Sequence, residues 1–286
     1  MHGDDKMIIS VASGKGGTGK TTVAVSLASS IENSQIIDCD VEEPNVHIFL
    51  NPEIKEEIEV KTTVPEVNKD KCNFCGYCSS ICAYNALSVF KLDSSGDVLV
   101  FHQLCHGCEG CILLCPEKAL KPVQRPIGLI KRGTAKGIEF IEGRLNIGEV
   151  LSPRVIESAK KYLKPEKLSI VDAPPGTSCP AVAAMKGSDF CILVTEPTPF
   201  GLHDLELAYE VTKVLGITCG VVINKSDQDS SIEDFCEANK ISILMKIPFS
   251  KQIAEAYSKG ISFVEGMPEF KERFRSLFEK IQRIIR

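Results

Sequence analysis

The sequence predicts an α/β protein built on a doubly wound, mostly parallel sheet, with a small α+β domain inserted into it. Short apolar runs alternate with helical patterns over most of the chain, which is the order expected of βαβ units. Between residues 64 and 123 the alternation stops, and eight cysteines appear there in two evenly spaced runs. We therefore expect one domain made of residues 1–63 and 124–286, and an inserted domain at residues 64–123.

The expected elements follow the chain in order. Apolar runs predict strands at 7–12, 35–40, 168–172, 189–195, 218–223 and 241–247, and a hairpin at 128–132 and 137–141. One helix is expected to start where the glycine loop meets the apolar run 23–28, and others to cover 151–163, 201–215 and 269–286. The last helix carries an apolar stripe beside basic residues, so it either packs on the parent domain, which the stripe favours, or lies on a membrane surface.

Composition argues against several classes of function. The 33 Lys and Arg residues against 38 Asp and Glu give a net charge of −5 without a basic block, so nucleic acid is not expected as a partner. No long apolar run and no charged-then-apolar leader is seen, and we expect a cytoplasmic protein without membrane contact. In such a chain, 13 cysteines favour metal sites over disulfides.

A glycine-rich loop between the first strand and the first helix predicts a nucleoside triphosphate site. Its glycines let backbone N–H groups wrap a phosphate, and the helix N-terminus adds partial positive charge. Lys20 is expected to reach the β- and γ-phosphates and the Thr21 hydroxyl to bind Mg²⁺. The expected nucleotide contacts in this loop are Gly14, Lys15, Gly16, Gly17, Thr18, Gly19, Lys20, Thr21 and Thr22.

Lys15 occupies a position that the general phosphate-loop pattern leaves free. Its charged side chain cannot easily fold back onto its own phosphates. It could instead cross a dimer interface to the nucleotide of a second subunit, so we expect a catalytic role for Lys15 as well as for Lys20.

Two acidic residues at strand ends complete the predicted magnesium site. Asp40 follows the second expected strand and can join the Mg²⁺ shell or orient the attacking water. Asp172 ends another apolar strand, as a carboxylate that holds a Mg²⁺ water must. The alternatives are a turn aspartate and a helix cap, respectively. The Gly176 N–H, in the Pro-Pro-Gly that follows Asp172, is the expected γ-phosphate contact.

Later in the chain, Asn224 and Pro248 are expected beside the nucleotide base. The Asn224 amide can both donate and accept a hydrogen bond and so suits a purine edge; its alternative role is to cap a helix near residue 230. Pro248 begins a loop that could flank the base.

The two cysteine runs have the spacing of bacterial two-cluster ferredoxins, in which each fourth cysteine serves the other cluster. This spacing predicts a ferredoxin-like domain with two [4Fe–4S] clusters. Glycines at 76, 107 and 110 are expected to adopt positive φ, and His102 and His106 to face solvent or donate to the clusters. The expected ligands are Cys72, Cys75, Cys78 and Cys115 for one cluster, and Cys105, Cys108, Cys111 and Cys82 for the other.

Structural zinc is the alternative for these cysteines, because four thiolates can hold one tetrahedral Zn²⁺. Zinc ribbons pair two short knuckles, whereas each run here has three evenly spaced cysteines and a fourth. The first run has Ala83 where Pro116 follows the second, which changes a turn and leaves the ligand set intact.

The Gly-Lys-Gly-Gly-x-Gly-Lys-Thr-Thr loop, Asp40, the eight-cysteine insertion and Asp172-Ala-Pro-Pro-Gly176 together resemble the MinD/Mrp superfamily of P-loop ATPases with an inserted ferredoxin domain, relatives of the nitrogenase iron protein. The resemblance implies that Lys15 reaches across a face-to-face dimer, that Asp40 acts in hydrolysis and that Asn224 contacts adenine. It implies ATP and Mg²⁺ as ligands, and a homodimer, or a heterodimer with a paralogue, formed through the nucleotide face.

The leading functional hypothesis is an ATPase that acts as a dimeric switch and gates electron transfer from its two clusters to a redox partner. One alternative is a scaffold or carrier that delivers metalloclusters to a client protein. Cys179, at the offset of an intersubunit cluster ligand in the nitrogenase iron protein, offers half of such a shared site, but we expect a buried or switch cysteine there. A further alternative is spatial organisation in the manner of MinD.

Overall fold

The computed structural model describes residues 7–92, 95–164, 166–226 and 230–286. These residues divide into two compact units. The first contains the chain up to Ile58 together with Ile130–Arg144 and Pro153–Arg286, and the second contains Glu59–Leu129 and Leu145–Ser152. Two of the boundaries fall within strands β3 and β6, so the chain passes from one unit to the other inside these strands.

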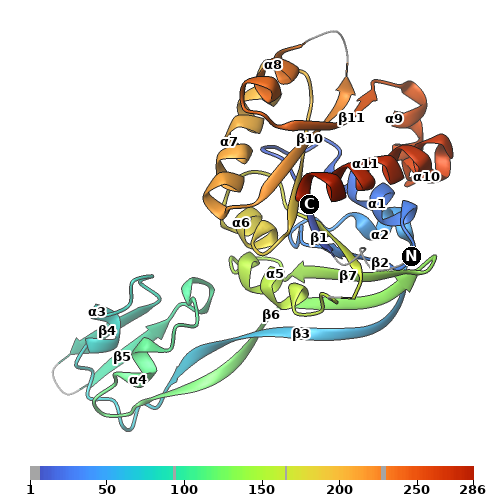
Figure 1. The fold of residues 1–286 in the computed structure, drawn as a ribbon. Helices are drawn as coiled ribbons and strands as arrows, with labels where there is room; N and C mark the ends of the chain where they lie inside the picture. The colour runs from blue at the N-terminus through green and yellow to red at the C-terminus, as the bar shows by residue number, and fades with distance from the viewer. Residues whose placement is uncertain (1–6, 93–94, 165, 227–229) are drawn as a thin grey trace. The chain divides into compact units, whose positions relative to one another are not determined.

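The central sheet has nine strands in the order β11-β10-β9-β1-β8-β2-β7-β6-β3 (Figure 1). Strand pairs from β11 to β7 are parallel, as predicted for an α/β protein. The strands are β1 (Met7–Ala12), β2 (Ser34–Asp38), β3 (Glu53–Val67), β6 (Leu120–Ala135), β7 (Ile138–Leu145), β8 (Leu168–Asp172), β9 (Phe190–Thr195), β10 (Thr218–Ser226) and β11 (Ser242–Pro248).

Helices follow most of these strands, as expected of βαβ units. They are α1 (Lys20–Ser30), α2 (Val46–Leu50), α5 (Ser152–Lys160), α6 (Cys179–Met185), α7 (Pro199–Leu215), α8 (Ser231–Ala238), α9 (Lys251–Ser258), α10 (Phe263–Gly266) and α11 (Glu269–Ile285). The predicted helices and strands are found with ends that differ by a few residues. The larger differences are β3 and the helices α2, α6, α9 and α10, which were not predicted, and β6, which begins before residue 128.

Both faces of the parallel sheet are buried. Successive residues of a strand point to opposite faces, and here both members of neighbouring pairs are inaccessible to solvent. Ile36 and Ile170 join a core shared with α1 and α11, whereas Ile37 and Val171 are buried outside that core. The sheet is therefore covered on two sides, as in a doubly wound fold.

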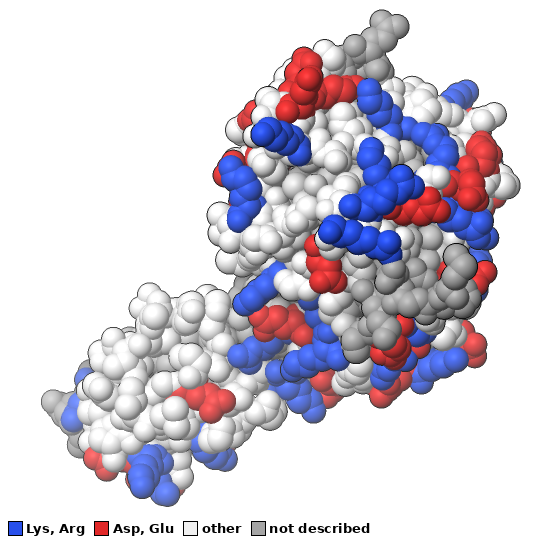
Figure 2. Space-filling view, in the orientation of Figure 1, with Lys and Arg blue, Asp and Glu red and all other residues white. Residues whose placement is uncertain are grey.

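Helix α11 packs its apolar stripe into the core of the first unit. Phe270, Phe274, Leu277, Phe278 and Ile281 are buried and belong to the same cluster as residues of α1. Lys and Arg side chains gather over this helix on the face seen in Figure 2. Some of them donate hydrogen bonds to backbone carbonyls. Arg273 donates to the Lys246 carbonyl, and Arg275 donates to the Ser30 carbonyl. The apolar stripe of α11 is therefore buried against the core of the first unit. Within the described residues, no helix has the length and apolar composition to span a bilayer.

The second unit has a small core that includes cysteines. Strands β4 (Leu87–Leu92) and β5 (Ser95–Val100) form an antiparallel pair, and the short helices α3 (Tyr77–Ser80) and α4 (Gly110–Leu113) lie in the two cysteine runs. A 3₁₀ turn covers His102–Leu104. Val64, Leu87, Val98 and Leu120 are buried together with Cys105 and Cys111, and the other core cysteines are partly buried. With so few apolar residues, this unit has little core of its own.

Candidate functional site

The phosphate loop joins β1 to α1 with the geometry that its glycines allow. Gly17 and Gly19 have φ of 78° and 92°, a region that side chains with a Cβ rarely enter. A Cβ on Gly19 would also lie 2.5 Å from the Asn224 amide nitrogen. Lys20 is buried at the start of α1, and burial lowers its pKa, although the nearby Asp172 and Asp40 oppose the shift. The loop therefore presents a desolvated ammonium group to its cleft.

Asp172, at the end of β8, has a buried carboxylate that forms no salt bridge and no well-aligned hydrogen bond with the described residues. The groups near it that favour its ionised form are the Thr21 side chain and the Lys20 ammonium. Burial raises the pKa of Asp172 to about 7, although Thr21 and Lys20 oppose the shift. Burial likewise raises the pKa of Asp40 to about 6, which Lys20 opposes. Carboxylates in this state fit a divalent cation, since Mg²⁺ is typically held by one or two carboxylates together with phosphate oxygens and water.

Asp38 organises the segment that carries Asp40, a role that the sequence interpretation missed. Its carboxylate accepts hydrogen bonds from the backbone N–H groups of Asp40 at 3.1 Å, Asn45 at 2.9 Å and Val46 at 3.0 Å. The side chain is fully buried, and burial, followed by the charge of Asp172, raises its pKa well above the usual range. The Asp-x-Asp pattern at the end of β2 was the available signal. Residues 40–46 are thereby fastened to the sheet edge.

The far end of the cleft is apolar and aromatic. The cleft has a volume of about 390 Å³ and runs from the phosphate loop, past Asp40 and Asn224, to residues of β11, α9 and α10. Pro248, Phe249, Ile253, Tyr257 and Phe263 line this end. A polar phosphate end and an apolar end within one cleft match the two ends of a nucleotide. We call this feature the nucleotide cleft.

Two of the predicted nucleotide contacts, Asn224 and Gly176, already form hydrogen bonds within the protein. Asn224 lies within β10 and does not cap α8, whose N-cap is Ser230. Its amide nitrogen donates to the Thr18 carbonyl at 2.8 Å, and its oxygen accepts from the Lys225 N–H at 2.9 Å. One amide hydrogen and one lone pair remain for a base. The Gly176 N–H donates to the Ser13 carbonyl at 3.0 Å, so that bond must break before Gly176 can contact a phosphate.

Lys15 is held by a residue that follows β9. Its ammonium group lies 3.9 Å from Oε2 of Glu196, whose Oε1 accepts a hydrogen bond from Lys225 at 2.7 Å. The Glu196 side chain is mostly buried, whereas Lys15 is partly exposed. Sequence reasoning missed Glu196 because nothing local marks its contact with the phosphate loop.

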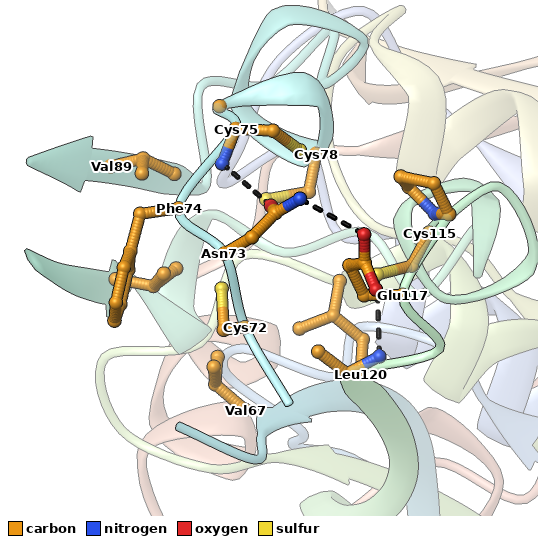
Figure 3. Close-up of a pocket in the computed structure, with 14 residues that line it drawn as sticks. Val67, Cys72, Asn73, Phe74, Cys75, Cys78, Val89, Cys115, Glu117 and Leu120 are labelled. Carbon is orange, nitrogen blue, oxygen red and sulfur yellow. Dashed lines mark hydrogen bonds between the residues drawn. The ribbon is translucent and has the colours of Figure 1, made fainter. Parts of the chain in front are cut away.

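The eight cysteines of the two runs line two separate cavities of the second unit. Cys72, Cys75, Cys78 and Cys115 line the first cysteine cavity (Figure 3). The second cysteine cavity is lined by Cys82, Cys105, Cys108 and Cys111. Each cavity thus combines three cysteines of one run with the fourth cysteine of the other.

Backbone donors accompany the fourth cysteine of each run. The Ala86 N–H donates to Cys82 Sγ and the Ala119 N–H to Cys115 Sγ, both at 3.3 Å. Among the predicted turn glycines, Gly76 and Gly107 have positive φ. Gly110 does not, and Glu109 before it takes that conformation, with φ of 61°. The prediction for Gly110 was wrong because it begins helix α4.

A single metal ion and a cubane cluster require different arrangements of these thiols. Within the described part of the chain, no group of three or more His, Cys, Asp or Glu side chains is placed to hold one metal ion. A cubane cluster sets a different requirement, because each of its four irons takes one thiolate and the ligands surround a cavity. Each cavity here is lined by four cysteines, and one sulfur in each set accepts a hydrogen bond from a backbone N–H. These are the types of group that a cubane cluster needs around it.

The remaining cysteines lie in the first unit. Cys39, Cys191 and Cys236 are buried and Cys219 is partly buried, in line with core residues. Cys179 is exposed at the start of α6, so of the two roles expected for it the buried one is wrong and the switch role stays a prediction.

The match to known families settles the class of the first unit. Residues 9–263 match the family described as the CobQ/CobB/MinD/ParA nucleotide binding domain. The chain belongs to this family. Because the match includes the phosphate loop, Asp40 and Asp172, these residues lie within a MinD/ParA-type nucleotide-binding domain, and the α/β fold with a mostly parallel sheet is the fold of that class.

Individual proteins resemble this MinD/ParA-type chain over nearly its whole length. Two uncharacterized proteins of Methanocaldococcus jannaschii are 30% and 35% identical to it; they cover 98% and 91% of this chain, and the matches cover 98% and 93% of theirs. The septum site-determining protein MinD of Pyrococcus horikoshii, solved with Mg-ADP, is similar in structure, with a TM-score of 0.59 and 22% identity over 97% of this chain and 96% of that one. At this identity the likeness concerns the fold.

A third relative matches only part of the MinD/ParA-type chain. Ferredoxin-3 of a Nostoc species is 29% identical over 66 residues, which cover 18% of this chain and 68% of the ferredoxin. This similarity is partial and does not by itself assign clusters to the chain.

Proposed function

We propose that this MinD/ParA-type protein hydrolyses ATP, that residues 64–123 form a domain with two [4Fe–4S] clusters, and that the nucleotide state gates electron transfer to a partner protein. The observation that carries the proposal is the division of eight cysteines into two groups of four, each with one member from the opposite run, in a chain that also has a P-loop nucleotide cleft.

In the nucleotide cleft, each residue has a role that its environment supports. The loop from Gly14 to Thr22 would wrap the phosphates, with the buried Lys20 ammonium against the β- and γ-phosphates. Thr21 and Asp172 would hold Mg²⁺, whose positive charge would stabilise the ionised form of the buried Asp172 carboxylate. Asp40, with a pKa of about 6, is mostly ionised at neutral pH and would orient the attacking water or take its proton.

A dimer would complete the cleft. Lys15 of one protomer would act at the nucleotide of the other, for which it must leave Glu196. The charge of Lys15 would then stabilise the developing negative charge on the phosphates. A homodimer, or a heterodimer with a paralogue, is therefore part of the proposal.

In the second unit, the eight cysteines would ligate the clusters, which supply one-electron chemistry when bound. Cys72, Cys75, Cys78 and Cys115 would hold one cluster, and Cys82, Cys105, Cys108 and Cys111 the other. The N–H groups of Ala86 and Ala119, already directed at sulfur, would stabilise the anionic thiolates.

Chain connectivity offers a route between the two sites. Residues 40–46 are fastened to Asp38, α2 follows at Val46–Leu50, and β3 then runs from Glu53 to Val67. The first cysteine of the first run comes soon after β3 ends. A displacement of residues 40–46 by nucleotide would therefore act on the strand that leads to the cysteines.

A cluster carrier is the second candidate, and the exposure of Cys179 favours it. A labile cluster shared between protomers needs accessible thiols, and Cys179 would provide one from each copy. The electron-gating function is preferred because the eight other cysteines form two complete sets within one chain.

Both candidates can be tested on protein purified without oxygen. Dithionite-reduced protein is mixed with oxidised cytochrome c, and the reoxidation rate is compared with ATP, with ADP and in Lys20→Ala. Electron gating predicts a rate that depends on nucleotide in the parent protein and not in Lys20→Ala. Transfer of clusters to apo-ferredoxin on the timescale of ATP turnover would instead contradict gating and support the carrier.

A further inference from the structure

The two cysteine runs repeat one another residue by residue in the structure. A constant interval along the chain relates Cys72 to Cys105 and Cys82 to Cys115. The same interval relates the two alanines whose N–H groups donate to the fourth cysteines. It also pairs the positions with positive φ, which are Phe74 with Gly107, Gly76 with Glu109, and Asn85 with Lys118. The two cavities are therefore equivalent in backbone, and side chains at matching positions can be compared directly.

Matching positions above the two cavities hold different contacts. In the first cysteine cavity, Asn73 donates a hydrogen bond to Glu117 at 3.0 Å, and its oxygen accepts from the Cys75 N–H (Figure 3). The equivalents of Asn73 and Glu117 are His106 and Tyr84. Their rings stack with centroids 3.6 Å apart and planes inclined by 8°. Each contact joins the start of one run to the end of the other, and we call both contacts clasps.

We propose that these clasps make the two cysteine sites unequal, and that the site of Cys72, Cys75, Cys78 and Cys115 has the lower reduction potential. This inference rests on the proposed function, because it requires a cluster in each cavity.

The charge of the clasp determines which of the two sites has the lower reduction potential. Reduction adds one negative charge to an anionic group, and a neighbouring carboxylate opposes it. Glu117 lines the first cavity and is held there by Asn73. The matching position of the second cavity holds Tyr84, which has no such charge.

The residues that line the two cavities favour the same difference in reduction potential. Val67, Val89, Val98 and Leu120 line the first cavity, and apolar walls disfavour added charge. The second cavity also has the apolar residues Ile81, Leu87 and Ile112, but Thr63, Tyr84 and His106 add polar groups that can accommodate added charge better. Glu109 also lines the second cavity, at the position of Gly76, and it opposes this difference. Glu109 and Glu117 are both exposed, but Glu117 is held by its hydrogen bond from Asn73, and Glu109 serves as a control.

The test is a potentiometric titration followed by electron paramagnetic resonance, in which each site takes one electron from dithionite. Cys115→Ser and Cys82→Ser assign the two signals to the first and second cavities. We expect Glu117→Gln to raise the lower potential and leave the higher one unchanged. Exchange of the clasp by Tyr84→Glu with His106→Asn should lower the higher potential, whereas Tyr84→Phe, which keeps the stacked rings, should leave both unchanged. Glu109→Gln should raise only the potential of the second cavity.

The outcomes separate this inference from the proposed function. Wild-type protein without clusters would contradict the proposed function and the inference with it. Protein with two clusters whose potentials do not respond to Glu117→Gln, or whose lower potential belongs to the second cavity, would contradict the inference alone.

Discussion

Glu196 holds Lys15 within its own protomer, with 3.9 Å between the carboxylate oxygen and the ammonium nitrogen. The same carboxylate also bonds Lys225, beside Asn224 in the nucleotide cleft. A lysine that must act at the nucleotide of a second protomer has to leave this contact first. Glu196 thus competes with the proposed dimer for Lys15.

Glu196→Gln should therefore strengthen nucleotide-dependent dimerisation. An ion pair of this length and exposure contributes roughly 0–1 kcal/mol, and a homodimer breaks two of them, so we expect the dimer dissociation constant to fall by up to about 30-fold. Analytical ultracentrifugation with a non-hydrolysable ATP analogue measures it. Glu206→Gln, which removes an exposed carboxylate of α7, is the matched control. Weaker dimerisation of Glu196→Gln would show that Glu196 supports the dimer.

The two lysines of the phosphate loop should separate binding from hydrolysis. Lys20→Ala removes the buried ammonium and should abolish both ATP binding and turnover. Lys15→Ala should retain binding in its own cleft and lower turnover by at least about 10³-fold, the scale reported for cationic residues supplied in trans to a phosphoryl group. Isothermal titration and phosphate release measure the two properties. Parent-level turnover in Lys20→Ala would contradict the phosphate-binding role.

Stability without nucleotide should fall as pH rises. Folding raises the pKa of Asp172 from 3.8 to about 7 and that of Asp40 to about 6, so between about pH 4 and 7 the folded protein retains protons that the unfolded chain releases. Asp172→Asn removes the contribution of Asp172, whereas the buried Asp38 and Asp40 contribute in both proteins. The variant should be more stable than the parent at pH 8 by on the order of 2 kcal/mol, and should lose hydrolysis.

Urea unfolding at pH 5 and pH 8 without Mg²⁺ measures this dependence. The advantage of Asp172→Asn should shrink at pH 5, where the parent carboxyl is protonated. An equal difference between the two proteins at both pH values would mean that Asp172 does not titrate in this range.

Helix α11 should behave as part of the core. Phe274 is fully buried, and Phe274→Ala should lower the free energy of unfolding by about 3–5 kcal/mol. Ile285→Ala, at a side chain that is 40% exposed, should change it by less than about 0.5 kcal/mol. If α11 were a membrane anchor, Phe274→Ala would instead reduce liposome co-sedimentation and leave stability unchanged.

Local patterns in the sequence predicted the two candidate sites. The phosphate loop is one run of residues between a strand and a helix, and each cysteine run has fixed spacing. Long-range contacts were not predicted. Glu196 and Lys15 meet only because β9 lies beside β1 in the sheet, and the backbone bonds of Asp38 depend on how residues 40–46 fold back.

Element boundaries failed where local signals mislead. Strand β3 was missed because its first half is charged and exposed, without the apolar alternation of a half-buried strand. Strand β10 was predicted to end at residue 223, but it continues to Ser226 beside β11 and so includes Asn224. Tertiary pairing extends both strands beyond what their own residues indicate.

Iron and acid-labile sulfide analysis of protein purified without oxygen tests the central claim most directly. Two [4Fe–4S] clusters predict about eight irons and eight sulfides per chain, with loss of about half in Cys82→Ser or Cys115→Ser. The matched control, Cys219→Ser in the first unit, should keep the full content. Folded protein that carries stoichiometric zinc in place of iron, or no iron, would contradict the account.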